Sequence, residues 1–296
     1  MLFRSGFDVL GHIEYIKFIV EQGKLPLATD GSQMFQSPLY YMISAILYKF
    51  LLLFGATSQI LNFLTIIPLL CGLAMIEICY RTSLHAFPNR QDLQKLCTII
   101  GSFIPMNLYM SQYLGNEPLA AIFTALAILL TVAFLNEPQL ATTRKHQVFL
   151  GASLGLALLS KVTAVLLIVP VFLAFIIIQH QQNQSLKRIT TQVGTISLVI
   201  ITICGWYYLR NWILLGKPFI GGWDPSREIF WWQDPGYRTF NDFLTFGYVF
   251  VNPIYAATTG FWDAIYSTIW LDGFLGGKAI FKFRPHWNYD FVLSSV

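Results

Sequence analysis

The segment TAVLLIVPVFLAFIIIQ, residues 163–179, decides the fold class of this chain. It carries no charged side chain, and a run of about 20 apolar residues is long enough for a helix to cross a bilayer. Similar runs recur along the chain. The candidates for membrane-spanning helices are 59–80, 96–114, 118–135, 147–160, 163–179 and 193–215. The sequence therefore predicts an all-α polytopic membrane protein.

The composition supports the same class. Of the 296 residues, 55% are hydrophobic and 11% are charged, and the mean hydropathy is +0.57, whereas a soluble domain is about 25% charged. The net charge of +4 is modest and no basic run stands out, which argues against nucleic acid as a partner. The positive charges are better interpreted as signals of membrane topology.

Three links between the apolar runs are short and basic: 81–95, 136–147 and 180–188. Because cytoplasmic loops carry an excess of Lys and Arg, we expect all three links on the cytoplasmic side. The turns at 112–118 and 158–163 then lie outside, and so does the chain that follows the last span.

The apolar stretch 38–54 carries Lys49 and three tyrosines. If it crossed the membrane, every later loop would invert and the basic links would face outward. We therefore expect this stretch to lie on the outer leaflet or to dip into it. A full span is the alternative.

This topology divides the chain into three parts: an external loop with an amphipathic helix at 1–36, a transmembrane core at 37–215, and an external aromatic-rich region at 216–296. An N-terminus on the outer side, with no span before it, predicts a further transmembrane helix upstream of residue 1. The sequence RPHWNYDFVLSSV (284–296) reads as the lead-in to another span. We expect the chain to be part of a longer membrane protein.

The N-terminal stretch FDVLGHIEYIKFIVEQGKLP (7–26) predicts an amphipathic helix that lies at the membrane surface. Asp8, His12 and Tyr15 fall on one face by i, i+4 and i+3 spacing. A second face is apolar and a third is charged. Gly23 is a natural C-cap for this helix. The Asp–His–Tyr face is either part of a site or simply the solvated side of an interfacial helix.

Other polar residues collect on the same predicted side of the membrane: Glu117 in LGNEPLAA, Lys161 in the turn between two apolar helices, and Arg210 in YYLRNW after the last span. Each has a structural explanation of its own. Glu117 could be an acid favoured by a helix dipole, Lys161 a snorkelling lysine, and Arg210 an anchor to lipid headgroups. Their joint placement is more informative than any one of them.

The chemistry that fits this set is group transfer at the membrane surface from a lipid-phosphate donor. A carboxylate can accept a proton from an attacking hydroxyl. Lys161 and Arg210 can hold the leaving phosphate and offset the charge that develops on it. Apolar helices and aromatic residues can hold a polyprenyl chain and stack on sugar rings.

These residues also carry a family resemblance. The stretch 7–26, followed by QSPLYYMISAILYKFLLLFG (36–55), resembles the first external loop of GT-C glycosyltransferases, in the branch similar to protein O-mannosyltransferases and aminoarabinose transferases. That branch has Asp-Glu with a His four residues after the Asp, then G-x-x-P, then a PPL-Y opening. Asp8 and His12 match. Further similar elements are Gly23–Pro26, SPLYY (37–41), GNEPLAA (115–121), LSKVTA (159–164), YYLRNWILLGKP (207–218), FWDAIYSTIWLDG (261–273) and RPHWNYD (284–290).

The resemblance implies a GT-C-like transmembrane helix bundle that acts as a glycosyltransferase in the plasma (inner) membrane, with its site on the periplasmic or extracellular face. It implies a polyprenyl-phosphate-linked sugar as donor, and a protein, lipid or polysaccharide as acceptor. Asp8 would be the catalytic base. The residues expected to bind substrate are His12, Tyr15, Tyr40, Glu117, Lys161 and Arg210.

The sequence departs from the family pattern at two positions. Val9 stands where the family has a Glu after the Asp, and Ser37 replaces the first proline of the pair. The missing second carboxylate weakens the case for a divalent metal at that pair, so we expect no cofactor, and a divalent metal is the alternative that stays open. The four cysteines lie within or beside apolar segments and are better interpreted as small buried side chains than as metal ligands.

Two alternatives to a glycosyltransferase stay open. One is a membrane transporter, which would place ionisable or helix-breaking residues within its spans. Most ionisable residues here lie near span ends, but Glu77 and the prolines Pro68, Pro105 and Pro170 lie within predicted spans. The other alternative is a catalytically inactive, truncated membrane remnant.

Overall fold

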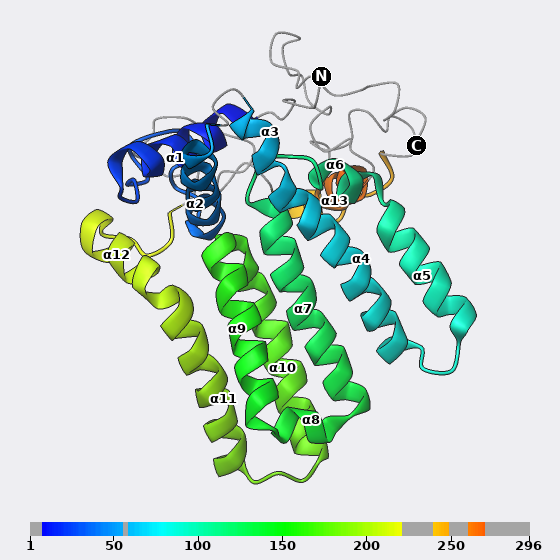
Figure 1. Cartoon of the computed structure of the whole chain (residues 1–296). Coiled ribbons are helices and arrows are strands. Elements are labelled where there is room, and N and C mark those ends of the chain that lie inside the picture. The colour runs from blue at the N-terminus through cyan, green and yellow to red at the C-terminus, as the bar shows by residue number, and fades with distance from the viewer. Residues whose placement is uncertain (1–7, 56–58, 221–238, 249–259, 270–296) are drawn as a thin grey trace.

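The computed structural model describes residues 8–55, 59–220, 239–248 and 260–269, and no strand occurs among them. The protein is an all-α polytopic membrane protein (Figure 1). Its long helices are α4 (Ile66–Ala86), α7 (Glu117–Asn136), α9 (Arg144–Ser160), α10 (Val165–Gln181) and α11 (Leu186–Ile200). The remaining elements are α1 (Val9–Gln22), α2 (Leu39–Leu53), α3 (Ile60–Leu64), α5 (Gln91–Phe103), α6 (Pro105–Met110), α8 (Pro138–Thr142), η1 (Val162–Ala164), η2 (Ile201–Gly205), α12 (Trp206–Leu215), η4 (Phe240–Phe243) and α13 (Phe261–Ile269).

Among the residues that the structure describes, four helical segments are long and apolar enough to cross a membrane: Ile60–Ala86, Glu117–Asn136, Val162–Gln181 and Leu186–Leu215. They correspond to four of the predicted spans. In the last of them, the π-helical η2 joins α11 to α12 without a break in the segment.

The structure differs from the prediction at 96–114. This range is not one continuous helix, because α5 ends at Phe103 and α6 begins at Pro105. Ile104 between them has φ −55° and ψ 121°, which is extended backbone. A proline disfavours helical geometry in the residue before it and has no N–H for the helical ladder, so the helix stops there.

The predicted span 147–160 forms the C-terminal part of α9, which has 17 residues and lies in the middle of the bundle. Its apolar residues form a core with side chains of α7, α10 and α11. Two glycines of α9, Gly151 and Gly155, lie against α11 and η2: a Cβ built on Gly151 would be 2.8 Å from the carbonyl oxygen of Ile196. Small residues of this kind let two membrane helices approach closely.

The connections divide between the two ends of the bundle (Figure 1). The links α4–α5, α7–α9 and α10–α11, which contain the three basic stretches, lie at one end. The helices α1, α2, α3 and α6 lie at the opposite end, with a second apolar core between them. Residues far apart in sequence therefore meet at the end that carries α1.

The stretch 38–54 forms α2, a 15-residue apolar helix that packs on α1 at this end. Its position relative to the bilayer stays a prediction, as do the domain limits 1–36, 37–215 and 216–296. The motif at 284–290 and the last residues of the motif at 261–273 lie outside the described residues.

Candidate active site

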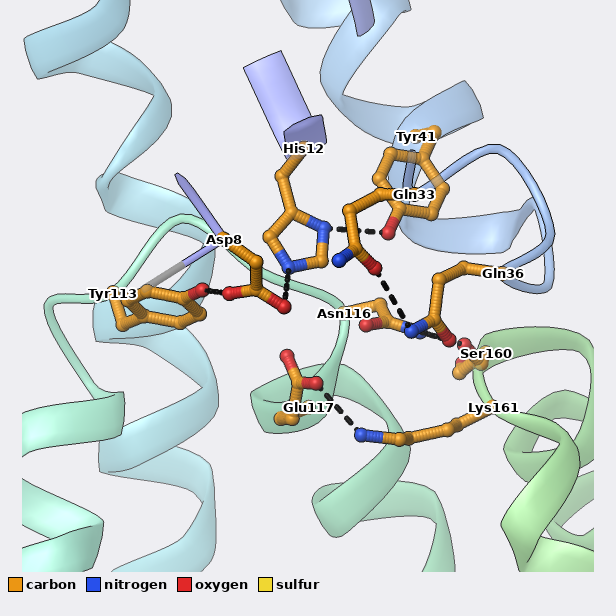
Figure 2. A network of polar contacts seen from close by, with 10 residues as sticks. All are labelled: Asp8, His12, Gln33, Gln36, Tyr41, Tyr113, Asn116, Glu117, Ser160 and Lys161. Carbon is orange, nitrogen blue, oxygen red and sulfur yellow. Dashed lines mark hydrogen bonds and ion pairs between the residues drawn. The ribbon is translucent and has the colours of Figure 1, made fainter. Parts of the chain in front are cut away.

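A cluster of polar side chains lies where α1 meets the segment before α7 and the turn after α9 (Figure 2). Asp8 and His12 come from the start of α1. Glu117 is the first residue of α7. Lys161 follows the last residue of α9. The structure thus brings together four of the seven residues that the sequence singled out.

Asp8 occupies the position just before α1, where a short polar side chain usually caps the helix. Here it makes no cap hydrogen bond. Its Oδ2 lies 3.4 Å from His12 Nε2, and its Oδ1 accepts a hydrogen bond from the hydroxyl of Tyr113. Both carboxylate oxygens are thus directed into the cluster and away from the helix backbone.

His12 is fully buried, and its two ring nitrogens face Tyr41 and Asp8. Its Nδ1 lies 2.6 Å from the hydroxyl of Tyr41. Its Nε2 makes the ion-pair contact with Asp8, and whether Nδ1 or the Tyr41 hydroxyl is the donor depends on the protonation of the ring. His12 is therefore held between Tyr41 on one side and Asp8 on the other.

The ionisation of Asp8 reflects two opposed effects. Burial by itself raises the pKa of this carboxyl. The hydrogen bond and charge of His12, the hydrogen bond of Tyr113 and the charge of Lys161 outweigh burial, so the pKa of Asp8 is lowered from its usual value. Burial and the charge of Asp8 raise the pKa of Tyr113, which keeps its hydroxyl protonated as a donor. Asp8 is a carboxylate at neutral pH.

Glu117 and Lys161 form an ion pair beside this group, with 2.7 Å between Oε1 and Nζ. The side chains are 24% and 28% exposed, so the pair is only partly open to solvent. It lines one side of a cavity of about 480 Å³ between α7, η1 and α10. The other walls are mainly apolar and include Ala120, Leu167 and Pro170.

A chain of side-chain amides lies behind the ion pair (Figure 2). The Asn116 Nδ2 donates to the carbonyl oxygen of Ser160 at 2.6 Å and to Gln36 Oε1 at 3.3 Å. Gln36 in turn donates from Nε2 to Gln33 Oε1 at 3.3 Å. These contacts tie the loop after α1 to the start of α7 and to the end of α9.

The other three residues expected to bind substrate have different surroundings. Tyr15 and Tyr40 are each 1% exposed. The Tyr15 ring stacks on Tyr41 with 3.8 Å between centroids, so these tyrosines pack behind the cluster. Arg210 donates from Nη2 to the carbonyl oxygens of Leu25 at 2.9 Å and Pro26 at 3.0 Å, and thereby holds the loop after α1. A direct role in substrate binding stays a prediction for all three.

Sequence reasoning missed five side chains of the cluster: Gln33, Gln36, Tyr41, Tyr113 and Asn116. A signal existed for some of them. Tyr113 and Asn116 lie in QYLGNEP, the turn that supplies Glu117, and Tyr41 is the last residue of the SPLYY element. Gln36 directly precedes that element and carried no signal of its own.

The described residues contain no group of three or more His, Cys, Asp or Glu side chains that could hold a metal ion. Asp8 and Glu117 are the two carboxylates of the cluster, and Tyr113 and His12 already contact the oxygens of Asp8. The expectation that no metal or other cofactor is required stays a prediction.

Comparison with known families gives one finding. The sequence model of the dolichyl-phosphate-mannose-protein mannosyltransferase family matches residues 36–208, which is more than half of the chain. The chain belongs to this family. Comparison with curated proteins and with solved structures gives no match.

Membership of the mannosyltransferase family makes the chain a GT-C-type glycosyltransferase by family, as the resemblance implied. The matched residues include the turn with Tyr113, Asn116 and Glu117, and also Lys161. Asp8 and His12 precede the matched range, so the geometry of the cluster is what connects them to the matched residues Glu117 and Lys161. The family also favours a transferase over a transporter.

Proposed function

We propose that the protein transfers a sugar from a polyprenyl-phosphate-linked donor to a hydroxyl of a protein, lipid or polysaccharide acceptor at the outer face of the plasma membrane. The observation that carries this proposal is the meeting of two pairs of side chains at one end of the bundle, where the second pair also lines an apolar cavity. Asp8 with His12 forms the first pair, and Glu117 with Lys161 forms the second.

Asp8 acts as the base. The acceptor hydroxyl attacks the anomeric carbon of the donor sugar and gives its proton to the carboxylate. The new glycosidic bond forms as the bond from the anomeric carbon to the phosphate oxygen breaks, which is a single displacement with inversion. The lowered pKa of Asp8 supports this role because the base is ionised before the acceptor arrives.

Lys161 meets the donor phosphate. The leaving group is a polyprenyl phosphate whose charge rises as the bond breaks, and an ammonium within the site stabilises that charge. The apolar walls of the adjoining cavity, from Ala120 to Pro170, suit an isoprenoid chain. Arg210 is a second candidate for the phosphate, provided that it leaves the carbonyl oxygens that it binds in this structure.

The arrangement of the links supports an outer-face site. The basic links lie at the end of the bundle opposite to the cluster. If the positive-inside rule holds for them, the cluster faces the periplasm or the cell exterior.

The test uses the full-length protein in proteoliposomes with polyprenyl-phosphate mannose as donor and acceptor membranes from the host. Asp8→Asn is expected to lower the transfer rate about 100-fold or more, because the amide cannot accept the proton. Asp92→Asn is the matched control: Asp92 binds Arg90 on the exposed basic link, away from the cluster. Transfer by Asp8→Asn at near the wild-type rate would show that Asp8 is not the base.

A further inference from the structure

Among the described residues, two buried oxygen atoms of the cluster have no hydrogen-bond partner, Asn116 Oδ1 and Glu117 Oε2. His12 Nε2 also makes no hydrogen bond, but it lies 3.4 Å from Asp8 Oδ2 in an ion-pair contact. Asn116 is fully buried. An acceptor that has lost its water and gained no donor is unfavourable, so such atoms in a site point to a ligand that donates to them.

The orientation of Asn116 is fixed by its amide nitrogen. Nδ2 faces two acceptors, the Ser160 carbonyl oxygen and Gln36 Oε1, and only a donor fits between them. The amide oxygen must therefore point the opposite way. Figure 2 shows it directed toward the space below His12, on the side of Asp8 and Glu117.

The orientation of the Glu117 carboxylate is also set by one of its contacts. Its Oε1 binds Lys161, and Oε2 points up toward Asp8 and His12 (Figure 2). The side chain lies directly over Gly115, since a Cβ on that glycine would be 2.5 Å from Oε2. The free oxygens of two adjacent residues thus face the same space.

The two unpaired acceptors limit which part of the donor can bind here, because that part must donate hydrogen bonds. A phosphate offers acceptors at neutral pH and an isoprenoid chain offers neither donors nor acceptors, so neither can satisfy these atoms. A sugar ring carries neighbouring hydroxyls, each of which can donate to one oxygen. Lys161 is already engaged on the far side of Glu117, where the apolar cavity begins.

We propose that Asn116 and Glu117 accept hydrogen bonds from two neighbouring hydroxyls of the transferred sugar, and that Asn116 Oδ1 determines sugar specificity. This inference rests on the proposed function and adds which group of the donor the two residues recognise. A site built to bind a hydroxyl discriminates against the analogue that lacks it, because the acceptor is then left buried and unpaired.

The experiment measures equilibrium binding to the full-length protein in nanodiscs. The probes are polyprenyl-phosphate mannose, its four monodeoxy analogues and polyprenyl phosphate without sugar. For the wild type, removal of one particular hydroxyl is expected to weaken binding about tenfold. Asn116→Ala is expected to bind the parent and that deoxy analogue equally, and to bind the sugarless lipid as the wild type does.

Gln147→Ala is the matched control. Gln147 is also a buried amide whose Nε2 donates to a carbonyl oxygen, that of Ala141 at 3.0 Å, but it lies at the opposite end of the bundle. This variant is expected to keep the preference for the parent sugar. Asn116→Ser, which also removes the amide oxygen, replaces the alanine variant if that variant gives little folded protein.

The outcomes separate the two proposals. The inference is overturned if Asn116→Ala keeps the wild-type preference for the parent sugar, or if the wild type binds all five sugar-bearing lipids and the sugarless lipid equally. A wild type that prefers the parent lipid, and loses this preference in Asn116→Ala, but transfers no sugar, contradicts the proposed function and supports the inference.

Discussion

Tyr113 is one of the residues that lower the pKa of the proposed base, after His12. Its hydroxyl donates to Asp8 Oδ1, although the two residues are 105 positions apart in the chain. The hydrogen bond favours the ionised form of Asp8 and is one of the causes of its lowered pKa. Because burial acts in the opposite direction, the net shift depends on these donors.

The prediction at this scale concerns pH. Asp8 acts as a carboxylate, so the transfer rate falls as the pH drops through its pKa in the enzyme. Tyr113→Phe removes one interaction that lowers this pKa, so the acid limb of kcat/KM is expected to move to higher pH. Tyr80→Phe, a change on the exposed side of α4, is the control and is expected to leave the limb in place. An unshifted limb in Tyr113→Phe would mean that the hydrogen bond does not tune the base.

Only part of the cluster could be predicted from the sequence. Asp8 and His12 are separated by one helical turn, so their pairing follows from local geometry. Glu117 and Lys161 could be assigned to one side of the membrane but not to one ion pair, because 44 residues separate them. Tyr113 and Asn116 enter through contacts across the fold, which the pattern of a single sequence does not contain. Arg210 was assigned to phosphate from its charge, whereas in this structure it binds backbone carbonyls.

At the scale of elements, the contact between α9 and α11 fixes the turn that carries Lys161. A Cβ built on Gly151 in α9 would lie 2.8 Å from the carbonyl oxygen of Ile196. A Cβ built on Gly155 would lie 3.3 Å from the Cα atom of Ile200. Apolar side chains gain little by leaving lipid for another helix, so close approach and packing hold membrane helices together. The two glycines permit that approach.

Gly151→Ala is therefore expected to destabilise the protein by about 1–3 kcal/mol, since its new methyl group would force α11 away from α9. Helix propensity alone predicts the opposite sign, because alanine is favoured over glycine by about 1 kcal/mol within a helix. Gly194→Ala on α11 tests the effect of helix propensity by itself, because a Cβ there meets nothing within 4 Å. Thermal unfolding in detergent should show a lower Tm for the first variant and an equal or higher Tm for the second. A Tm for Gly151→Ala at or above the wild-type value would contradict the packing argument.

The limits of the helices show where the pattern of apolar residues was sufficient to predict an element. Long apolar runs predicted helices α7 and α10 closely, because the bilayer imposes both their length and their composition. The run 96–114 is also rich in apolar residues, but Pro105 interrupts it after Ile104. A mean hydropathy over a window of residues hides a single proline, but that proline still disfavours helical geometry in the residue before it.

At the scale of the whole molecule, the fold places the basic links far from the proposed active site. The basic links lie at one end of the bundle and the Asp8 cluster lies at the other. In the described part of the chain, four helical segments long enough to span a bilayer lie between these ends. If the links are cytoplasmic, the acceptor must be available on the outer side, and a donor lipid must present its sugar there.

This sidedness can be tested by labelling with a membrane-impermeant maleimide in intact cells. In a variant whose four native cysteines are replaced, Thr29→Cys introduces a thiol in the exposed loop after α1, and Gln182→Cys introduces one in the link between α10 and α11. Because the positive-inside rule places the link in the cytoplasm, we expect the thiol at 29 to react in intact cells and the thiol at 182 to react only after permeabilisation. Each variant is also labelled in detergent, which confirms that its thiol is reactive. The reverse pattern would place the cluster on the cytoplasmic side, and a donor presented from the cytoplasmic leaflet would then have to replace the one proposed.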